Sequence, residues 1–446
     1  MFDVLFRNAK LVCAHEIVLG DLAVKNGVIC AIGSNLGESL HTIDVAGDYI
    51  FPGGIDVHVH FNEPGNEEWE GFATGSKLLA AGGVTTYFDM PLNANPPTIN
   101  VEVLKLKQQL ADEKSIGTPY FWGGLVHDNV AQLEALANEG VIGFKAFLSN
   151  SGFTPFAAVK NDSLLEGMRE IARLGKILAV HAESEDLTSF LQQQKIAEGK
   201  LTAQDYAESR PIVAEVEAVN RVLYFAELTG CPVHFVHISS AAAVERIQGA
   251  KQRGLDVSVE TCPHYVWFNE QTLERGVLAK CAPPLRPEAE QKNLLDCLLT
   301  GQIDMIASDH SPCPPAMKNL TTQNFFQAWG GINGGQFTLL TLLTLCDNYN
   351  VPYENVAKWL SDVPAQRFKL EKRGRLEVGQ AADFTIVTKK PFTVTQQNHF
   401  AKHKGTIYEG ETFNHTIVAT YSGGGCVYEG EESDPVYATS SSSQNE

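Results

Sequence analysis

The sequence lacks three features that would place the protein at a membrane or on nucleic acid. It has no apolar run long enough to cross a bilayer, which takes roughly 20 helical residues. It has no basic N-terminal region followed by an apolar segment, so we expect no secretion signal and a cytoplasmic protein. Basic residues are scarce, with 34 lysines and arginines against 53 acidic residues and a net charge of −19. We therefore expect no nucleic-acid partner and no membrane partner.

Paired cysteines and dinucleotide-binding glycines are also missing. The nine cysteines are irregularly spaced, and none forms a C-x-x-C pair. Without a secretion signal, this spacing favours reduced thiols over a disulfide framework. No G-x-G-x-x-G turn follows a predicted strand. The usual signature of a doubly wound, nucleotide-binding sheet is therefore absent.

The central part of the chain contains a regular alternation of strand and helix patterns. Eight strand candidates are separated mostly by helical stretches. This repeat predicts an α/β fold of the (β/α)8 TIM-like barrel type, whose active site lies at the C-terminal strand ends. A doubly wound open sheet is the alternative. The strand candidates are 55–61, 85–90, 120–126, 143–148, 177–183, 233–239, 256–265 and 303–310.

The two ends of the chain have a different pattern, with short strands separated by turns. We predict that residues 1–53 and 370–430 form one composite β-sandwich domain beside the barrel of residues 54–369. Residues 431–446 are polar and rich in serine, which predicts a disordered tail.

The segment 55–61 carries the first chemical signal. Its apolar and polar residues alternate, so Asp56, His58 and His60 share one face of a predicted strand. Two imidazoles spaced in this way can reach one metal ion from the same side. The alternative is a half-buried strand with two hydrogen-bonded histidines.

Further polar side chains stand near the C-terminal ends of other predicted strands. They are Lys145, His181, His237 and Asp309. In a barrel these groups and the two histidines of the first strand would meet at one mouth. Four histidines, an aspartate and a lysine are too many ligands for one tetrahedral ion. They suit a pair of divalent ions that share a bridging hydroxide.

Lys145 is the unusual member of this set, because a charged amine would be repelled by metal ions. One interpretation is a structural salt bridge. The other is an amine that burial keeps neutral and that takes up carbon dioxide as a carbamate. A carbamate is an anion with two oxygens and can bridge two ions. The surrounding histidines and Asp309 favour the carbamate.

Three other histidines lie close to this set in the sequence. His234 stands three residues before His237, which predicts that it faces the other side of the strand, outside the barrel wall. His264 and His310 are predicted to support the metal ligands by hydrogen bonds.

These motifs resemble the cyclic-amidase branch of the amidohydrolase superfamily, which includes dihydroorotases, hydantoinases (dihydropyrimidinases) and allantoinases. The resemblance covers nearly the whole chain. It implies a metal-dependent hydrolase of cyclic amides. The motifs are HVH (58–60), GFKAFL (143–148), VHAE (180–183), VHIS (236–239) and ASDHSP (307–312).

The resemblance also implies a role for each member of the set. His58, His60 and Asp309 would bind the buried ion, and His181 and His237 would bind the outer one. Carboxylated Lys145 would bridge the two ions. As general base, Asp309 would deprotonate the bridging water and later protonate the leaving nitrogen. Zinc is the expected metal, although cobalt, manganese or iron can use the same ligands.

Three stretches separate the members of this branch. Asn62 replaces an arginine that pairs with the substrate carboxylate in dihydroorotase-like sequences. The segments 81–98 and 328–336 resemble those of allantoinases. The resemblance therefore implies ring opening of allantoin to allantoate in purine breakdown. The expected substrate contacts are the amides of Asn62, Asn93 and Asn333 and the backbone around Cys281 and Ala282.

The sequence also fits several alternatives. A hydantoinase (dihydropyrimidinase) or a dihydroorotase would use the same mechanism, and the three asparagines also fit as turn formers. A different class is a non-catalytic assembly protein, which such relatives become when they lose metal ligands. All six ligand positions are filled here. The resemblance implies a homo-oligomer, and we expect a tetramer.

Overall fold

Eight parallel strands follow one another around a barrel, in the spatial order β13-β12-β11-β10-β9-β8-β7-β6. The computed structural model describes residues 1–319, 321 and 324–430. Each of the eight predicted strands overlaps one of these strands, so the predicted (β/α)8 barrel is confirmed. The bounds are β6 (Gly54–Val59), β7 (Val84–Asp89), β8 (Thr118–Gly124), β9 (Gly143–Phe147), β10 (Leu178–His181), β11 (Val233–Phe235), β12 (Val257–Thr261) and β13 (Met305–Ile306).

The first and last strands meet through the segment that follows β13. Val59 and His310 form a parallel bridge, and His310 forms another with Ile332. The His60 amide donates to the His310 carbonyl at 2.9 Å. Because β13 itself has only two residues, this segment completes the barrel next to β6.

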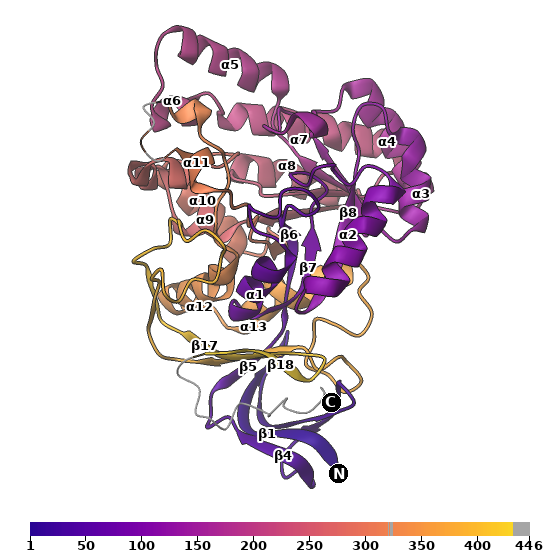
Figure 1. Ribbon diagram of the computed structural model, residues 1–446, viewed down its shortest axis with the longest axis vertical. Coiled ribbons are helices and arrows are strands. Elements are labelled where there is room, and N and C mark those ends of the chain that lie inside the picture. The colour runs from indigo at the N-terminus through magenta and orange to yellow at the C-terminus, as the bar shows by residue number, and fades with distance from the viewer. Residues whose placement is uncertain (320, 322–323, 431–446) are drawn as a thin grey trace.

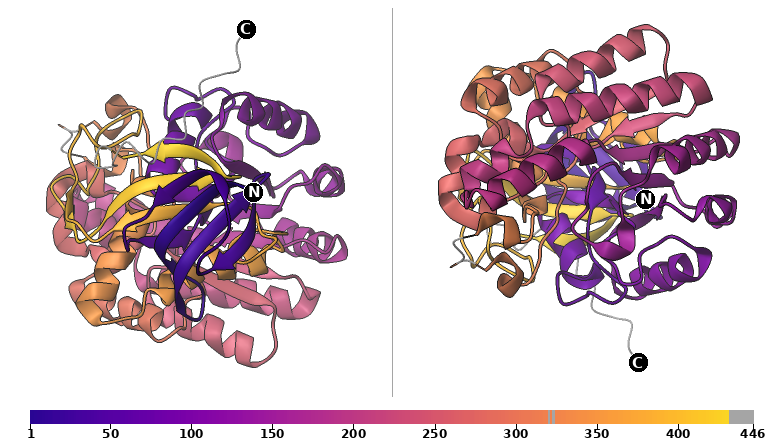
Figure 2. Two further views of the ribbon diagram at one scale, coloured as in Figure 1. Left: turned by 90° about the horizontal axis from the view of Figure 1, so that it is seen from below. Right: turned by 90° about the horizontal axis from the view of Figure 1, so that it is seen from above.

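Helices cover the outside of the barrel (Figures 1 and 2). Polar caps define several of their starts: the Asn100 side chain accepts from the Val103 amide, and the Ser240 side chain accepts from the Ala243 amide. None of the helices in the described part of the chain has the length and apolar character needed to cross a bilayer. The α-helices are α1 (Phe72–Ala81), α2 (Val101–Lys114), α3 (Leu133–Asn138), α4 (Asn161–Arg173), α5 (Glu185–Ala197), α6 (Ala203–Glu208), α7 (Ile212–Thr229), α8 (Ala241–Gln252), α9 (Pro263–Trp267), α10 (Glu288–Leu299), α11 (Pro315–Lys318), α12 (Thr338–Tyr349), α13 (Glu354–Ala357) and α14 (Val363–Arg367).

Short helical turns connect these elements. The 3-10 turns are η1 (Val130–Gln132), η2 (Thr154–Phe156), η3 (Glu270–Ala279), η4 (Phe325–Gln327) and η5 (Gly335–Phe337), and η6 (Lys358–Asp362) is a π-helical turn.

Strands from both ends of the chain form a second sheet, in the order β18-β17-β14-β5-β1-β2-β3 with β4 paired to β1. It lies at the end of the barrel where β6 begins (Figure 1), and the Gly53 amide donates to the Asp383 carbonyl there. The sheet therefore leaves the C-terminal strand ends uncovered. Its strands are β1 (Phe2–Val12), β2 (Ile17–Lys25), β3 (Val28–Gly33), β4 (Ser39–Asp44), β5 (Tyr49–Pro52), β14 (Phe384–Thr388), β17 (Thr416–Ser422) and β18 (Gly425–Glu429), and the small pair β15 (Phe392–Thr393) and β16 (Thr412–Phe413) lies apart from it.

The domain bounds given from the sequence stay a prediction. Both ends of the chain contribute to the same hydrogen-bonded sheet, as expected for one composite domain. The predicted disordered tail, residues 431–446, lies outside the described residues.

Aromatic side chains fill the barrel beneath the predicted site. The ring of Phe368 lies edge-on to those of Phe88 and Trp122, with centroids 5.0 and 5.5 Å away. It also contacts the His234 ring, with a centroid distance of 5.5 Å. These side chains are almost fully buried. Because this end of the barrel is packed with apolar rings, a polar substrate must enter from the opposite end.

Candidate active site

The structure brings the six predicted metal-ligating residues together at the C-terminal mouth of the barrel. Five of them line one pocket, and Lys145 is buried in the middle of β9 beside it. His58 and His181 lie at the ends of β6 and β10, whereas the other three follow the strands β6, β11 and β13. The pocket-lining five are His58, His60, His181, His237 and Asp309.

His58, His60 and Asp309 form the inner group of the site. The Asp309 Oδ1 atom lies 3.3 Å from the Nε2 atom of each histidine. One possible ligand atom from each residue lies within 4.8 Å of the others, so the three can hold a metal ion together. Both histidines are buried, while the Asp309 side chain is 13% exposed to the pocket.

His181 and His237 form the outer pair. Their facing nitrogens, His181 Nδ1 and His237 Nε2, are 3.0 Å apart. Burial lowers the pKa of both rings, and the nearby charge of Lys145 lowers it further. The His181 ring stacks on Phe147, with centroids 4.4 Å apart. Two neutral rings facing each other in this way can offer lone pairs to a second ion.

Lys145 is a buried amine whose neutral form is easier to reach than that of an ordinary lysine. None of the described residues offers its Nζ atom a hydrogen-bond partner. Burial lowers its pKa to about 8, although Asp309 and Glu260 act in the opposite direction. Its Nζ atom lies 5.1 Å above the Phe147 ring. The salt-bridge interpretation therefore lacks a carboxylate partner among the described residues.

Glu260 on β12 supports the inner group, and sequence reasoning missed it. Its Oε1 atom lies 2.6 Å from His58 Nδ1, and its Oε2 atom lies 2.8 Å from His234 Nε2. The pKa of Glu260 is raised to about 8, mainly by burial. Ser258 and Glu260 alternate with valines on β12, a pattern that marks a polar strand face inside the barrel.

The prediction that His234 faces outward is wrong. His234 is fully buried, and its Nδ1 atom lies 2.8 Å from the Ser258 hydroxyl. The strand β11 ends at Phe235, and His237 has a left-handed backbone with φ of 41°. Alternation along a strand therefore does not extend from His234 to His237, and both side chains turn inward.

Glu183, in the VHAE motif, supports the outer pair. Its Oε2 atom lies 2.8 Å from His181 Nε2 and 2.5 Å from Arg210 Nη1. Burial alone would raise its pKa, but the Arg210 charge and the His181 hydrogen bond outweigh burial and lower the pKa to about 2. The carboxylate is therefore an anion at neutral pH.

The histidines at 264 and 310 have different surroundings from one another. Burial lowers the pKa of His264 to about 4, and neither of its ring nitrogens has a hydrogen-bond partner among the described residues. The His310 Nε2 atom lies 3.5 Å from Glu70, and His310 is not among the described residues that line the inner pocket. Its contribution to the site comes from its backbone, which pairs with β6.

The predicted substrate contacts divide into two groups. Asn93, Cys281 and Ala282 line the pocket, and Asn93 Nδ2 lies 3.3 Å from His60 Nδ1. Asn62 is buried in a left-handed turn with φ of 69° and does not line the pocket. The Asn333 amide donates to the carbonyls of residues 403 and 405, so this side chain is engaged elsewhere.

A larger polar pocket adjoins the inner one. The two share five lining residues, and the larger one also includes Arg210 and Lys280. The Lys280 Nζ atom donates to the Phe326 and Ala328 carbonyls and so holds the loop that leads to Trp329. The larger pocket provides a route from the surface to the inner group. The shared residues are Asn150, Ser151, Ala282, Trp329 and Gly330.

A parallel barrel with this group of histidines, lysine and aspartate at its mouth defines an amidohydrolase. The profile of the amidohydrolase family matches residues 49–425, and the chain belongs to this family. Among solved structures, the L-hydantoinase (dihydropyrimidinase) from Arthrobacter aurescens superposes with a TM-score of 0.93 and 31% identity, covering 96% of each chain.

Within the family the chain belongs with the allantoinases. It is 51% identical to the allantoinase of Bacillus velezensis, covering 96% of this chain and 94% of that protein. It is 45% identical to the allantoinase of Deinococcus radiodurans, covering 96% of each. The predicted resemblance and the predicted class of enzyme, a cyclic amidohydrolase, are both confirmed.

Proposed function

We propose that the protein hydrolyses the cyclic amide bond of allantoin to give allantoate, a step of purine catabolism. The high identity to allantoinases over almost the whole chain supports this substrate. One structural observation separates this substrate from dihydroorotate. None of the described residues that line the inner pocket is an arginine or a lysine. Such a pocket suits a neutral ring better than the carboxylate of dihydroorotate.

The donor set fits a pair of divalent ions, and we propose zinc. His58, His60 and Asp309 would hold the inner ion, and His181 and His237 would hold the outer one. Their rings are buried, and the Nζ atom of Lys145 has no partner among the described residues. When bound, such ions polarise an amide carbonyl and make a water nucleophilic near neutral pH.

Asp309 is proposed as the general base. Its side chain reaches the pocket surface, and its Oδ1 atom already faces His58 and His60. The Oδ2 atom can then take a proton from the attacking water and return it to the leaving ring nitrogen. An amide needs this return because its nitrogen leaves poorly as an anion.

Lys145 is proposed to carry a carbamate. Its neutral Nζ atom attacks the carbon of carbon dioxide, a nitrogen–carbon bond forms, and the nitrogen releases a proton to solvent. The product is an anion with two oxygen donors, and Lys145 in this form would join the residues that hold the ions. The lowered pKa of Lys145, about 8, makes the neutral amine accessible near physiological pH.

We further propose a cytoplasmic homotetramer, which the resemblance to the branch supports. Light scattering on the purified full chain measures the mass in solution. A mass four times that of the 48.7 kDa chain is expected, and a monomer would contradict it.

Parallel turnover measurements test the proposed activity. Allantoin, dihydroorotate, hydantoin and dihydrouracil are compared on one sample whose metal content is also measured. We expect allantoin to be the best substrate and two ions per chain. A preference for dihydroorotate or hydantoin would contradict the substrate, and no turnover at full metal loading would support the non-catalytic alternative.

A further inference from the structure

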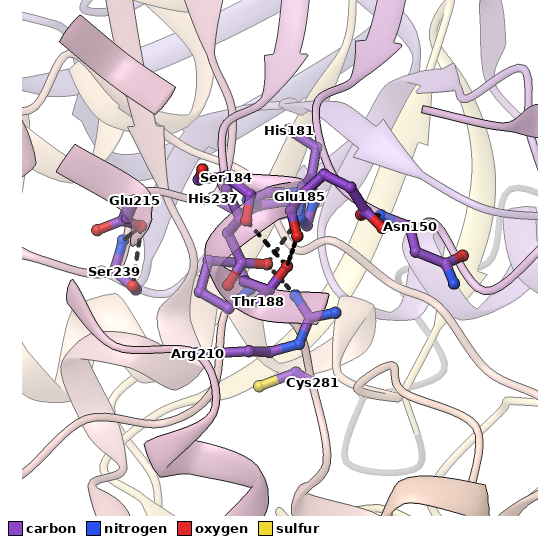
Figure 3. A network of polar contacts seen from close by, with 12 residues as sticks. Asn150, His181, Ser184, Glu185, Thr188, Arg210, Glu215, His237, Ser239 and Cys281 are labelled. Carbon is purple, nitrogen blue, oxygen red and sulfur yellow. Dashed lines mark hydrogen bonds and ion pairs between the residues drawn. The ribbon is translucent and has the colours of Figure 1, made fainter. Parts of the chain in front are cut away.

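A chain of hydrogen bonds between buried polar groups lies behind the outer histidine pair. Figure 3 shows three of these groups, Arg210, Glu215 and Ser239, together with the two histidines. The first member of this network is Glu183, which is fully buried. One oxygen, Oε2, receives both His181 Nε2 at 2.8 Å and Arg210 Nη1 at 2.5 Å. The Arg210 guanidinium also lies over the Tyr206 ring, 5.7 Å from its centroid. The side chains of Glu183 and Arg210 are both buried, although Arg210 also lines the larger pocket.

This arrangement selects one tautomer of His181. A carboxylate is only an acceptor, so the ring nitrogen that faces Glu183 must carry the proton. The other nitrogen, Nδ1, then keeps its lone pair and points at His237. A ring in the opposite tautomer would turn its N–H toward the place where an ion has to bind. Glu183 therefore prepares His181 as a ligand without contacting the pocket itself.

The network continues to the turn that carries His237. Arg286 donates through Nη1 to the Arg210 carbonyl at 2.5 Å and through Nε to the Ser239 hydroxyl at 3.0 Å. The Ser239 amide and hydroxyl both donate to Glu215 Oε1 at 2.9 Å. Because Ser239 is two residues beyond His237, these bonds hold the left-handed turn in which His237 lies.

We propose that this network positions both outer histidines and so sets the affinity of the site for its second ion. The proposal rests on the two-ion site of the proposed function and deepens it. The members are positioning residues, since none of their side-chain contacts above is to a reacting atom. They are Glu183, Arg210, Arg286 and Glu215.

The inner group does not share this support. His58 is backed by Glu260, whose other oxygen contacts His234 rather than an arginine. Loss of the outer network should therefore weaken one ion and spare the other. A general loss of folding or of binding would instead affect both.

The variant Glu183→Gln tests this directly. A glutamine can place its carbonyl oxygen where Oε2 accepts from both partners, but it lacks the negative charge that pairs with Arg210. Its NH2 group can also turn toward either partner, so neither the pairing nor the His181 tautomer is enforced. Metal-free protein is titrated with zinc in competition with a chelator of known affinity. We expect one site of unchanged affinity and one weakened by about 10- to 100-fold, the usual range for groups that orient a metal ligand. Saturating zinc should restore much of kcat, with an unchanged KM for allantoin.

The matched control is Glu185→Gln, the same change two residues along the chain. Glu185 accepts hydrogen bonds from the Asn150 backbone amide and the Ser189 hydroxyl, and within the described ranges it has no hydrogen bond to a histidine. Its zinc titration should match that of the unchanged protein. Arg210→Lys keeps the charge but loses the planar fork, and it should weaken the same single site by a smaller factor.

The outcomes separate this proposal from the proposed function. If the unchanged protein binds two ions and Glu183→Gln binds both equally well, the positioning role is wrong. If the unchanged protein binds fewer than two ions, the two-ion site itself is wrong. Should Glu183→Gln not fold, Arg210→Lys gives the same readout, and nitrogen chemical shifts of His181 in metal-free protein report the tautomer. A proton on Nδ1 would also overturn the proposal.

Discussion

His58 and His181 each direct one ring nitrogen at a buried glutamate, and the two glutamates differ in what else they contact. Glu183 is paired with Arg210, and its pKa lies near 2. Glu260 is shared between two histidines, and burial raises its pKa to about 8. At neutral pH Glu183 is therefore an anion, whereas Glu260 is mostly protonated. The neighbours explain the difference: the guanidinium of Arg210 stabilises the anionic form of Glu183, whereas Glu260 is hydrogen-bonded to two imidazoles.

This comparison separates the two halves of the site. The outer half is supported by buried charged side chains, whose hydrogen bonds extend to the loops after β10 and β11. The inner half lies at strand ends, and its support comes from Glu260, which is hydrogen-bonded to both His58 and His234. Between them stands Lys145, which contacts neither glutamate at hydrogen-bond distance.

Replacing Lys145 should remove the connection between the halves. Lys145→Ala is expected to lower the content of both ions and to reduce kcat/KM by several orders of magnitude. Lys145→Arg should do no better, since a guanidinium stays charged and cannot take up carbon dioxide. Metal analysis and turnover on allantoin measure both effects. Near-normal activity of the arginine variant would rule out the carbamate.

The pKa of Lys145 adds a pH dependence. Its pKa of about 8 lies below that of an ordinary lysine, so the amine is mostly charged at pH 7 and mostly neutral at pH 9. Metal-free enzyme supplied with zinc and with a fixed concentration of dissolved carbon dioxide should therefore reactivate faster as pH rises across this range. A rate that falls with rising pH would contradict the uptake of carbon dioxide by the neutral amine.

Asp309→Asn should separate chemistry from metal binding in the inner half. The amide keeps the shape and one oxygen but cannot accept the proton, so kcat should fall by roughly 10²- to 10⁴-fold. Metal content should fall much less, whereas Asp309→Ala should lose both. Turnover that simply follows occupancy in the two variants would reduce Asp309 to a ligand.

Replacing each glutamate by glutamine tests the charge difference in metal-free protein. Glu183→Gln leaves a buried guanidinium unpaired, which should cost about 3–5 kcal/mol of unfolding free energy at pH 7. Glu260→Gln replaces a carboxyl that is mostly protonated at pH 7 and should cost far less. Urea unfolding followed by fluorescence measures both values. Equal losses of unfolding free energy would contradict the difference in charge between the two carboxyl groups.

The two variants should also differ in the direction of their pH dependence. The pKa of Glu183 is lowered from 4.5 to about 2, so its contribution is present above about pH 4.5 and fades as pH falls toward 2. The pKa of Glu260 is raised from 4.5 to about 8, so ionisation of the unfolded chain lowers stability as pH rises between these values. The unfolding free energy of Glu260→Gln should therefore rise relative to that of the unchanged protein from pH 5 to 8.

The smallest effect is expected at Asn62, in the loop after β6. Its φ of 69° is a left-handed conformation that asparagine and glycine tolerate. Asn62→Ala should cost about 1–2 kcal/mol, and Asn62→Gly should cost less. Thermal unfolding measures the loss. If Asn62→Arg instead raised dihydroorotate turnover relative to allantoin, the side chain would face the substrate.

Much of this site could be predicted from the sequence, because its ligands come from residues near strand ends. The alternation in 55–61 placed His58 and His60 on one face, and the repeat of strands placed Lys145 and Asp309 at the same mouth. Pattern alone could not find Arg210, which meets Glu183 from a loop 27 residues away. It also failed at His234, because the strand ends before the alternation reaches His237.

The closure of the barrel has a consequence for how the site would come apart. The bond from the His60 amide to the His310 carbonyl joins the first strand to the segment that carries Asp309. Any local opening along this line separates the proposed base from a proposed ligand before the rest of the barrel unfolds. The deuterium exchange rate of that single amide would then measure how often the enzyme is transiently inactive.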